Sequence, residues 1–231
     1  MQVNETYRVP LRLKLSRPIT KAVFRFIFHV LARVKVIGQE NIPYGKPYVV
    51  AMNHVSIFDP PLVGAFWPEQ LEIIGAADVF DKPGQGQVLK LYGVIPVHRG
   101  DYDRVLLTKI IHIINSGYPL LIAPEGGRSH VPAMRRAKSG VAYIIEQTSV
   151  PVVPVGLVGT TEDFWQLAKR GDRPQLEMRI GKPIDLPETT AKGNERHEAR
   201  QHNADLVMRH LAGLLPEEYR GVYAESAIFP T

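Results

Sequence analysis

From about residue 47 onwards, hydrophobic and polar positions alternate along the chain on two length scales. Short apolar runs rich in β-branched residues occur at "PYVVAM", "LEIIGA", "GVIPV", "YPLLIA" and "VPVVPVGL". Longer segments between these runs repeat apolar residues at helical spacing, over residues 60–67, 86–92, 103–116 and 139–148. Strands and helices that alternate on this scale predict an α/β fold, in which helices flank a mostly parallel, mixed central sheet.

Two later segments extend this pattern. The stretch "QLEMRIGKPI" alternates with the period of two that is typical of a half-exposed edge strand. Residues 195–215 have the spacing of a long helix that stops at Pro216. No change in composition separates these elements from the earlier ones, so residues 41–231 are predicted to form a single layered domain.

Residues 1–40 are predicted to be an N-terminal basic, amphipathic helical segment that associates with a membrane. In a predicted helix over residues 17–36, positively charged or histidine side chains recur every four residues: Lys21, Arg25, His29 and Arg33. Apolar residues fill much of the remainder, a pattern that suits a helix lying in a bilayer interface near anionic headgroups. The same pattern fits an amphipathic helix packed on the domain core, and the sequence leaves both interpretations open.

Composition and charge narrow the class of protein. Among 231 residues, 45% are hydrophobic and 22% are charged, which is typical of a folded chain rather than a disordered one. The net charge of +5 favours an anionic partner: nucleic acid, a phospholipid surface or a phosphorylated substrate. No cysteine is present, which excludes disulfides, thiolate metal sites and a cysteine nucleophile. The histidines have no metal-ligand spacing, so no metal and no cofactor are predicted.

Polar residues suited to chemistry follow the ends of several predicted strands. His54 and Asp59 come after the first strand, Arg99 after the third, and Glu125 and Arg128 after the fourth. In open α/β sheets, ligands bind beyond the carboxyl ends of the strands. If these strands are parallel neighbours, the five side chains gather at one edge of the sheet.

The stretch "NHVSIFDPP" separates His54 from Asp59 by five positions. On a continuous helix their side chains would diverge by roughly 140°. Pro60 favours a helix start, with Asp59 as its N-cap, after a compact loop that can turn His54 back toward Asp59. A carboxylate bonded to one imidazole nitrogen fixes the tautomer and stabilises the imidazolium. Taken alone, the motif also fits a capping aspartate beside an ordinary loop histidine.

Four sequence blocks resemble the four ordered motifs of the glycerolipid acyltransferase family, in particular the 1-acyl-sn-glycerol-3-phosphate acyltransferases. They are "NHVSIFD", "GVIPVHRG", "APEGGRS" and "VPVVPVGL", within residues 53–157. The later "RIGKPI" and "LLPEEYRGVY" are also similar to family sequences, so the resemblance covers most of the chain after the first helix. Two positions depart from the family pattern: Gly127 stands where threonine is more usual, and Ala123 where phenylalanine is.

The resemblance implies roles for individual residues. His54 would be the general base and Asp59 would orient it, while Arg99 would contact the acceptor phosphate. The acceptor site would be shaped by Glu125, Gly126, Gly127 and Arg128, with Arg128 also near phosphate. Residues 152–156 would support the acyl-binding side. Lys138 in "RRAKSG", or Arg135 and Arg136, would add phosphate contacts, although a solvated basic turn explains this segment equally well.

The reaction implied by the resemblance is acyl transfer from acyl-CoA or acyl-carrier protein to lysophosphatidic acid (1-acyl-sn-glycerol 3-phosphate), giving phosphatidic acid for phospholipid biosynthesis. The protein would then be peripheral or monotopic, on an anionic membrane surface at the cytoplasmic face of the cell membrane. Two alternatives stay open: an acyltransferase acting on glycerol 3-phosphate or another lipid acceptor, and a non-catalytic membrane lipid-binding module. Nucleic acid is not predicted as a partner, because the chain lacks the usual zinc-ligand and aromatic-basic motifs.

Overall fold

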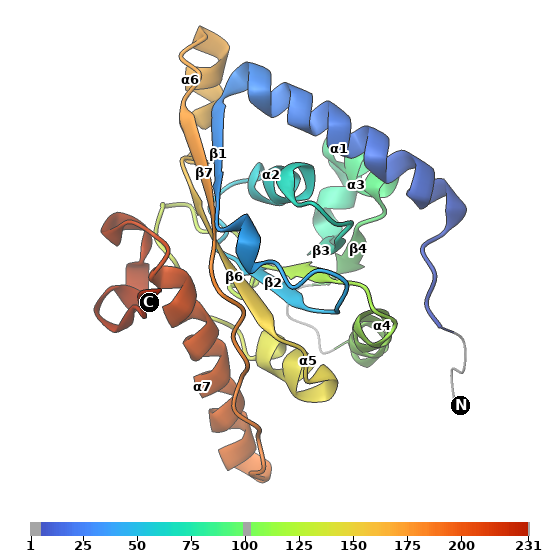
Figure 1. Cartoon of the computed structure of the whole chain (residues 1–231), viewed down its shortest axis with the longest axis vertical. Coiled ribbons are helices and arrows are strands. Elements are labelled where there is room, and N and C mark those ends of the chain that lie inside the picture. Colours follow the sequence, from blue (N-terminus) through green and yellow to red (C-terminus); the bar gives the residue numbers. More distant parts are fainter. Residues whose placement is uncertain (1–5, 99–102, 231) are drawn as a thin grey trace.

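The computed structural model describes residues 6–98 and 103–230, and one mixed sheet runs through its centre (Figure 1). The strand order is β1-β7-β6-β2-β5-β3-β4. Neighbouring strands are parallel except β6 and β7, which are antiparallel. The strands are β1 (Arg33–Ile37), β2 (Val49–Met52), β3 (Glu72–Ala76), β4 (Ile95–Val97), β5 (Leu120–Ile122), β6 (Val152–Val158) and β7 (Gln175–Ile180). The predicted α/β fold with a mostly parallel, mixed sheet is confirmed.

Helices cover both faces of this sheet. Successive side chains of a strand point to opposite faces, so Val50 and Met52 of β2 pack toward α1 and α2, whereas Val49 and Ala51 pack toward α4, α5 and α7. The α-helices are α1 (Leu11–Leu31), α2 (Asp59–Phe66), α3 (Gln85–Tyr92), α4 (Arg104–Asn115), α5 (Gly140–Thr148), α6 (Phe164–Arg170) and α7 (Gly193–Ala212). Four short 3-10 helices complete the description: η1 (Gln39–Asn41), η2 (Ala77–Asp81), η3 (Glu217–Tyr219) and η4 (Gly221–Ser226).

Two predictions from the pattern were wrong. The predicted N-terminal helix over residues 17–36 instead begins at Leu11 and ends at Leu31, and "RVKVI" forms β1, whose charged and apolar residues alternate as in a strand. The edge position predicted for "QLEMRIGKPI" belongs to β1, because β7 lies between β1 and β6. The half-exposed pattern of β7 arises because one of its faces is only partly covered, where Glu177 pairs with Arg179.

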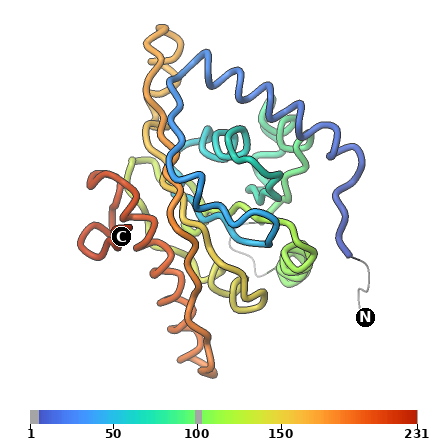
Figure 2. The backbone as a smooth tube through the Cα atoms, viewed as in Figure 1, coloured from blue at the N-terminus to red at the C-terminus, as the bar shows by residue number. Residues whose placement is uncertain are grey.

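One side of α1 is fixed to the core by a buried ion pair. The Arg17 guanidinium donates to both carboxylate oxygens of Glu72, at 2.6 and 2.8 Å, and its Nε donates to the carbonyl of Tyr92 at 2.9 Å. Arg17 and Glu72 are each 1% exposed. The helix therefore crosses α2 and α3 on its way to β1 as a fixed part of the domain (Figure 2).

The cationic stripe expected on this helix lies along its border with α2, with Lys21 partly buried and Arg25 and His29 exposed. Lys21 donates to the carbonyls of Trp67 and Pro68, just beyond the end of α2. Arg25 and His29 both lie against the ring of Phe66, 5.3 Å from its centroid. The positive charges thus sit near the carboxyl end of α2, where a helix carries partial negative charge.

The opposite side of α1 exposes an apolar stripe. Its members are spaced by three or four residues, so they share one helical face: Leu11, Leu15, Ile19, Val23, Phe26 and Val30. Within the described residues, no helix combines the length and the apolar character needed to cross a membrane.

We expect Glu72→Ala to lower the free energy of unfolding by about 3–5 kcal/mol, because it leaves the Arg17 guanidinium buried without its counter-charge. Urea unfolding followed by circular dichroism measures this change. Glu162→Ala is the matched control, since Glu162 faces His130 at 4.0 Å on the surface and its loss is expected to change stability by less than about 0.5 kcal/mol. Equal effects of the two substitutions would contradict the assigned importance of the buried pair.

Candidate active site

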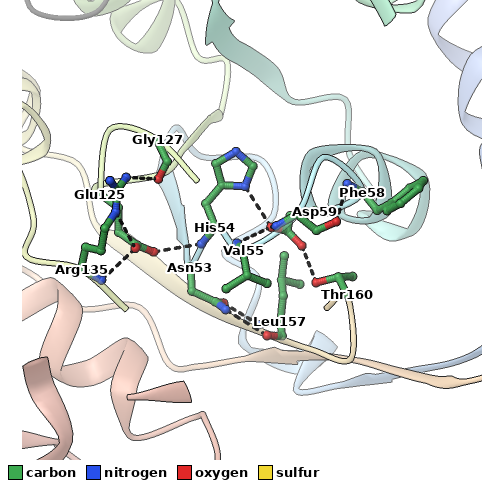
Figure 3. Close-up of polar contacts among 11 residues, drawn as sticks. Asn53, His54, Val55, Phe58, Asp59, Glu125, Gly127, Arg135, Leu157 and Thr160 are labelled. Atoms are coloured by element: carbon green, nitrogen blue, oxygen red, sulfur yellow. Dashed lines mark hydrogen bonds and ion pairs between the residues drawn. The ribbon is translucent and has the colours of Figure 1, made fainter. Parts of the chain in front are cut away.

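Three adjacent parallel strands bring the site together. β6, β2 and β5 are neighbours at the centre of the sheet, and their carboxyl ends lie at one edge. His54 follows β2, Glu125 follows β5 and Thr160 follows β6. Figure 3 shows Glu125 and Asp59 on opposite sides of the segment that carries His54. The predicted gathering of His54, Asp59 and Glu125 at one edge of the sheet is confirmed.

Asp59 is fully buried, and four donors surround its carboxylate. Oδ2 accepts hydrogen bonds from His54 Nδ1 at 2.9 Å, from the Val55 amide at 2.8 Å and from the Ser56 amide at 2.7 Å. Oδ1 accepts a hydrogen bond from the Thr160 hydroxyl at 2.5 Å (Figure 3). With four donors around it, the buried carboxylate is held in one orientation.

The predicted N-cap role of Asp59 is replaced by a different one. Asp59 is the first residue of α2, Phe58 occupies the cap position, and the carboxylate turns back to the preceding loop. The next two residues, Pro60 and Pro61, have no amide hydrogen and therefore offer the carboxylate no donor in the first helical turn. The loop amides supply the donors instead, and this draws residues 53–59 into a tight turn.

His54 presents one ring nitrogen to Asp59 and the other to an open cavity. Its side chain is 12% exposed, and no hydrogen bond within the described part of the chain uses Nε2. Because the carboxylate of Asp59 accepts a hydrogen bond from Nδ1–H, the neutral ring carries its free lone pair on Nε2. This geometry suits a general base directed into the cavity.

Glu125 holds the backbone on both sides of the site. Its side chain is fully buried, Oε1 accepts from the His54 amide and Oε2 accepts from the Arg135 amide, each at 2.9 Å. Burial raises the pKa of Glu125 above its usual value, and the two amide donors oppose that rise. Both oxygens are therefore engaged by backbone amides, so Glu125 shapes the site by placing its neighbours.

Positive side chains lie around the two glycines that follow Glu125. Arg128 is partly buried and lines the cavity, and within the described residues it has no acidic partner. Gly126 has φ +70°, and a Cβ there would lie 2.8 Å from Cδ of Lys138, so the lysine stem lies directly over the glycine. Arg135 donates to the carbonyl of Gly127 at 2.5 Å.

Two other predicted residues do not add to this cluster in the described part of the chain. Arg136 turns away to Asp205 of α7, with 3.4 Å between Nη2 and Oδ2. Arg99 lies outside the described residues. Of the predicted positions, His54, Gly126, Gly127 and Arg128 line the cavity, and Lys138 lies beside Gly126.

The cavity has a volume of about 390 Å³ and is mostly apolar away from His54 and Arg128. A smaller cavity of about 80 Å³ continues beneath α1 and shares part of its lining. The shared apolar side chains come from four elements: Phe24, Pro60, Pro61, Ile73, Ile74, Val88 and Leu89. Residues 152–156, predicted to support the acyl-binding side, lie within the buried strand β6 and are not part of the lining of this cavity.

Two buried polar residues were not singled out by the sequence. Asn53 pairs with the backbone of Leu157, donating from Nδ2 to the carbonyl at 3.0 Å and accepting from the amide at 2.7 Å. Thr160 is fully buried against Asp59. Asn53 could have been recognised from the sequence as a polar side chain at the end of a buried run. Thr160 follows an ordinary turn, and no sequence pattern marks it.

The chain is a member of the Acyltransferase family, whose model matches residues 33–158. The chain is similar to human 1-acyl-sn-glycerol-3-phosphate acyltransferase alpha, with 26% identity over 155 residues, covering 66% of this chain and 55% of that protein. It is also similar to the 1-acyl-sn-glycerol-3-phosphate acyltransferase of Saccharomyces cerevisiae, with 26% identity over 183 residues, covering 76% of this chain and 60% of that protein.

A solved structure shares the fold. The crystal structure of the 1-acyl-sn-glycerophosphate acyltransferase from Thermotoga maritima superimposes with a TM-score of 0.58 at 25% identity, covering 84% of this chain and 78% of that one. The chain spans about half the length of the curated relatives that it matches first. Membership of the family predicted from the four motifs is confirmed.

We expect the stability of the protein relative to its Glu125→Gln variant to fall as the pH rises above about 4.5. Because the folded-state pKa of Glu125 is raised, the folded protein keeps a proton that the unfolded chain has already lost in this range. The protonated carboxyl therefore favours folding at low pH, and this contribution disappears as the pH rises through the folded-state pKa. Urea unfolding of both proteins from pH 4 to pH 7 tests this expectation, and a pH-independent difference would contradict it.

Proposed function

We propose that this protein transfers a fatty acyl group from acyl-CoA or acyl-carrier protein to the free hydroxyl of 1-acyl-sn-glycerol 3-phosphate, giving phosphatidic acid. One observation carries the proposal: His54 pairs through Nδ1 with buried Asp59 and presents Nε2 to an apolar cavity whose lining includes Arg128. The names of the human, yeast and Thermotoga relatives support this choice of acceptor.

The chemistry follows from the free nitrogen of His54. Nε2 removes the proton of the acceptor hydroxyl as its oxygen attacks the thioester carbonyl carbon. The carbon–sulfur bond then breaks, and the imidazolium returns the proton to the departing thiolate. Asp59 stabilises the imidazolium between these steps, since its carboxylate remains bonded to Nδ1.

Acceptor binding is assigned to the positive residues beside the glycines. The planar guanidinium of Arg128 suits a phosphate, and Lys138 adds a positive charge where its stem crosses Gly126. We assign Arg99 to the same phosphate on the basis of the sequence motif. Gly126 and Gly127 let the phosphate approach the backbone closely.

The apolar cavity suits the acyl chain. It begins at His54 and continues between α2, β3 and α3 to the smaller cavity under α1. Its volume lies within the usual range for small-molecule sites, and each buried methylene contributes roughly 0.8 kcal/mol. An acyl chain lying in this cavity would have its carbonyl near His54.

We also propose that α1 holds the protein on a membrane surface, as a peripheral or monotopic protein at the cytoplasmic face. Six apolar side chains form its exposed stripe, from Leu11 to Val30, while its other face is fixed to the core through Arg17. An amphipathic helix in this orientation buries its apolar face at the headgroup boundary, and basic residues such as Arg8, Arg12 and Lys14 attract anionic lipid. The lipid acceptor would then reach the site from the bilayer.

We expect His54→Ala to lower kcat by roughly 10²–10⁴-fold without unfolding the protein, because it removes the base and leaves Asp59 bonded to Val55, Ser56 and Thr160.

Arg128→Ala is expected to raise the acceptor KM first, at a cost of about 2–5 kcal/mol. Thiol release from palmitoyl-CoA in lipid vesicles, with and without lysophosphatidic acid, measures both effects.

The same assay with glycerol 3-phosphate as acceptor, and with acyl-carrier protein as donor, separates the related activities. Lys169→Ala is a control, since this lysine contacts Trp165 on α6 and does not line the cavity. Turnover by His54→Ala near the wild-type rate would overturn the mechanism.

For the membrane proposal, we expect Val23→Glu to weaken binding to phosphatidylglycerol-containing vesicles by about 10-fold or more. The substitution places a charge on the exposed stripe and removes roughly 1.5 kcal/mol of apolar burial. Val105→Glu makes the same change at an exposed site on α4 and is expected to bind vesicles like the wild type. Vesicle co-sedimentation measures both, and equal losses would count against α1 as the membrane-facing helix.

A further inference from the structure

We infer that Thr160 is a positioning residue of the active site, which fixes the Asp59 carboxylate and thereby sets the proton affinity of His54. This inference rests on the proposed function for its consequence in turnover, but its geometric basis is independent. The Thr160 hydroxyl donates to Asp59 Oδ1 at 2.5 Å, and both residues are fully buried. A hydroxyl that donates to a carboxylate oxygen away from water makes a charge-assisted hydrogen bond.

The two oxygens of Asp59 are held in different ways. Oδ2 receives three donors from its own loop, namely His54, Val55 and Ser56. Within the described residues, Oδ1 receives a hydrogen bond only from Thr160, which is 101 positions away in the sequence. The loop donors keep Oδ2 against His54, and Thr160 fixes the second oxygen from a distant part of the chain.

The turn that carries Thr160 is itself held in place. The Gly159 amide donates to the Tyr219 hydroxyl at 3.0 Å, and a Cβ at Gly159 would lie 2.2 Å from the carbonyl oxygen of Gln175. The carbonyl of Tyr219 accepts from the Met134 amide at 2.9 Å. Met134 directly precedes Arg135, whose amide donates to Glu125. The 3-10 helix η3 therefore contacts both the turn that carries Thr160 and the loop that carries Arg135, and these two segments help to fix the His54 segment.

Loss of the Thr160 hydroxyl has a defined electrostatic sign. The hydroxyl hydrogen of Thr160 points at Asp59 Oδ1 and offsets part of the carboxylate charge. Without it, Asp59 attracts the protonated ring of His54 more strongly, so the ring keeps its proton to higher pH. Within the described residues, the other charged or titratable groups near this pair are Glu125, Arg128, Arg135, Asp163 and Tyr219, and Thr160→Val leaves all of them in place.

The test compares Thr160→Val, which keeps the shape of the side chain and removes the hydroxyl, with Thr160→Ser, which keeps the hydroxyl. We expect Thr160→Val to move the acidic limb of the pH profile of kcat/KM upward by about 0.5–1 pH unit. We expect kcat to fall about 10-fold with the acceptor KM unchanged, and Thr160→Ser to restore both values to near the wild type. NMR titration of the His54 ring, assigned by comparison with His54→Gln, is expected to show the same upward shift without any turnover.

Each outcome decides the inference. The inference is overturned if the valine and serine variants lose kcat equally while the pH profile and the ring titration do not move. Thr160 would then have a packing role. A wild type that transfers no acyl group would defeat the proposed function, and the ring titration alone would then decide the inference. If urea unfolding shows that Thr160→Val does not fold, Thr160→Ala takes its place with the same expected shift.

Discussion

The site depends on one interaction, the burial of the Asp59 carboxylate among four donors. A buried carboxylate is costly unless its oxygens are satisfied, and here the donors come from its own loop and from the turn after β6. That requirement draws the loop into a tight turn and directs His54 Nε2 into the cavity. The prolines at 60 and 61 contribute by withholding the amides that would otherwise attract the carboxylate into the helix.

A second constraint comes from the sheet order. With β2 between β5 and β6, the loop of residues 53–59 is held from one side by Glu125 and from the other by Thr160 and the backbone of Leu157. The apolar cavity lies on the remaining side of this loop, toward β3 and α3. α1 closes the far end of that cavity, and the Arg17–Glu72 pair fixes it there. The helix proposed to meet the membrane is thus also a wall of the proposed acyl site.

Much of this could be predicted from the sequence because it is local. The β-branched runs and the helical spacing between them placed the strands and helices within a few residues, and four ordered motifs indicated the family. The position of "QLEMRIGKPI" could not be predicted in this way, since a period of two reports only that one face is less covered. The strand "RVKVI" was assigned to a helix because its apolar residues continue the spacing of the helix before it.

The sequence by itself determined the chemistry at the ends of the strands: a histidine, a carboxylate five residues later, and a glycine pair followed by arginine. Only the tertiary structure decided that Glu125 holds backbone amides, that Lys21 of α1 donates to a carbonyl just beyond α2, and that Thr160 reaches Asp59 across 101 positions. The physical reason is that a hydrogen bond to a buried oxygen is made by whichever donor the fold brings within reach. A threonine after an ordinary turn has the same local sequence whether or not a carboxylate lies opposite it.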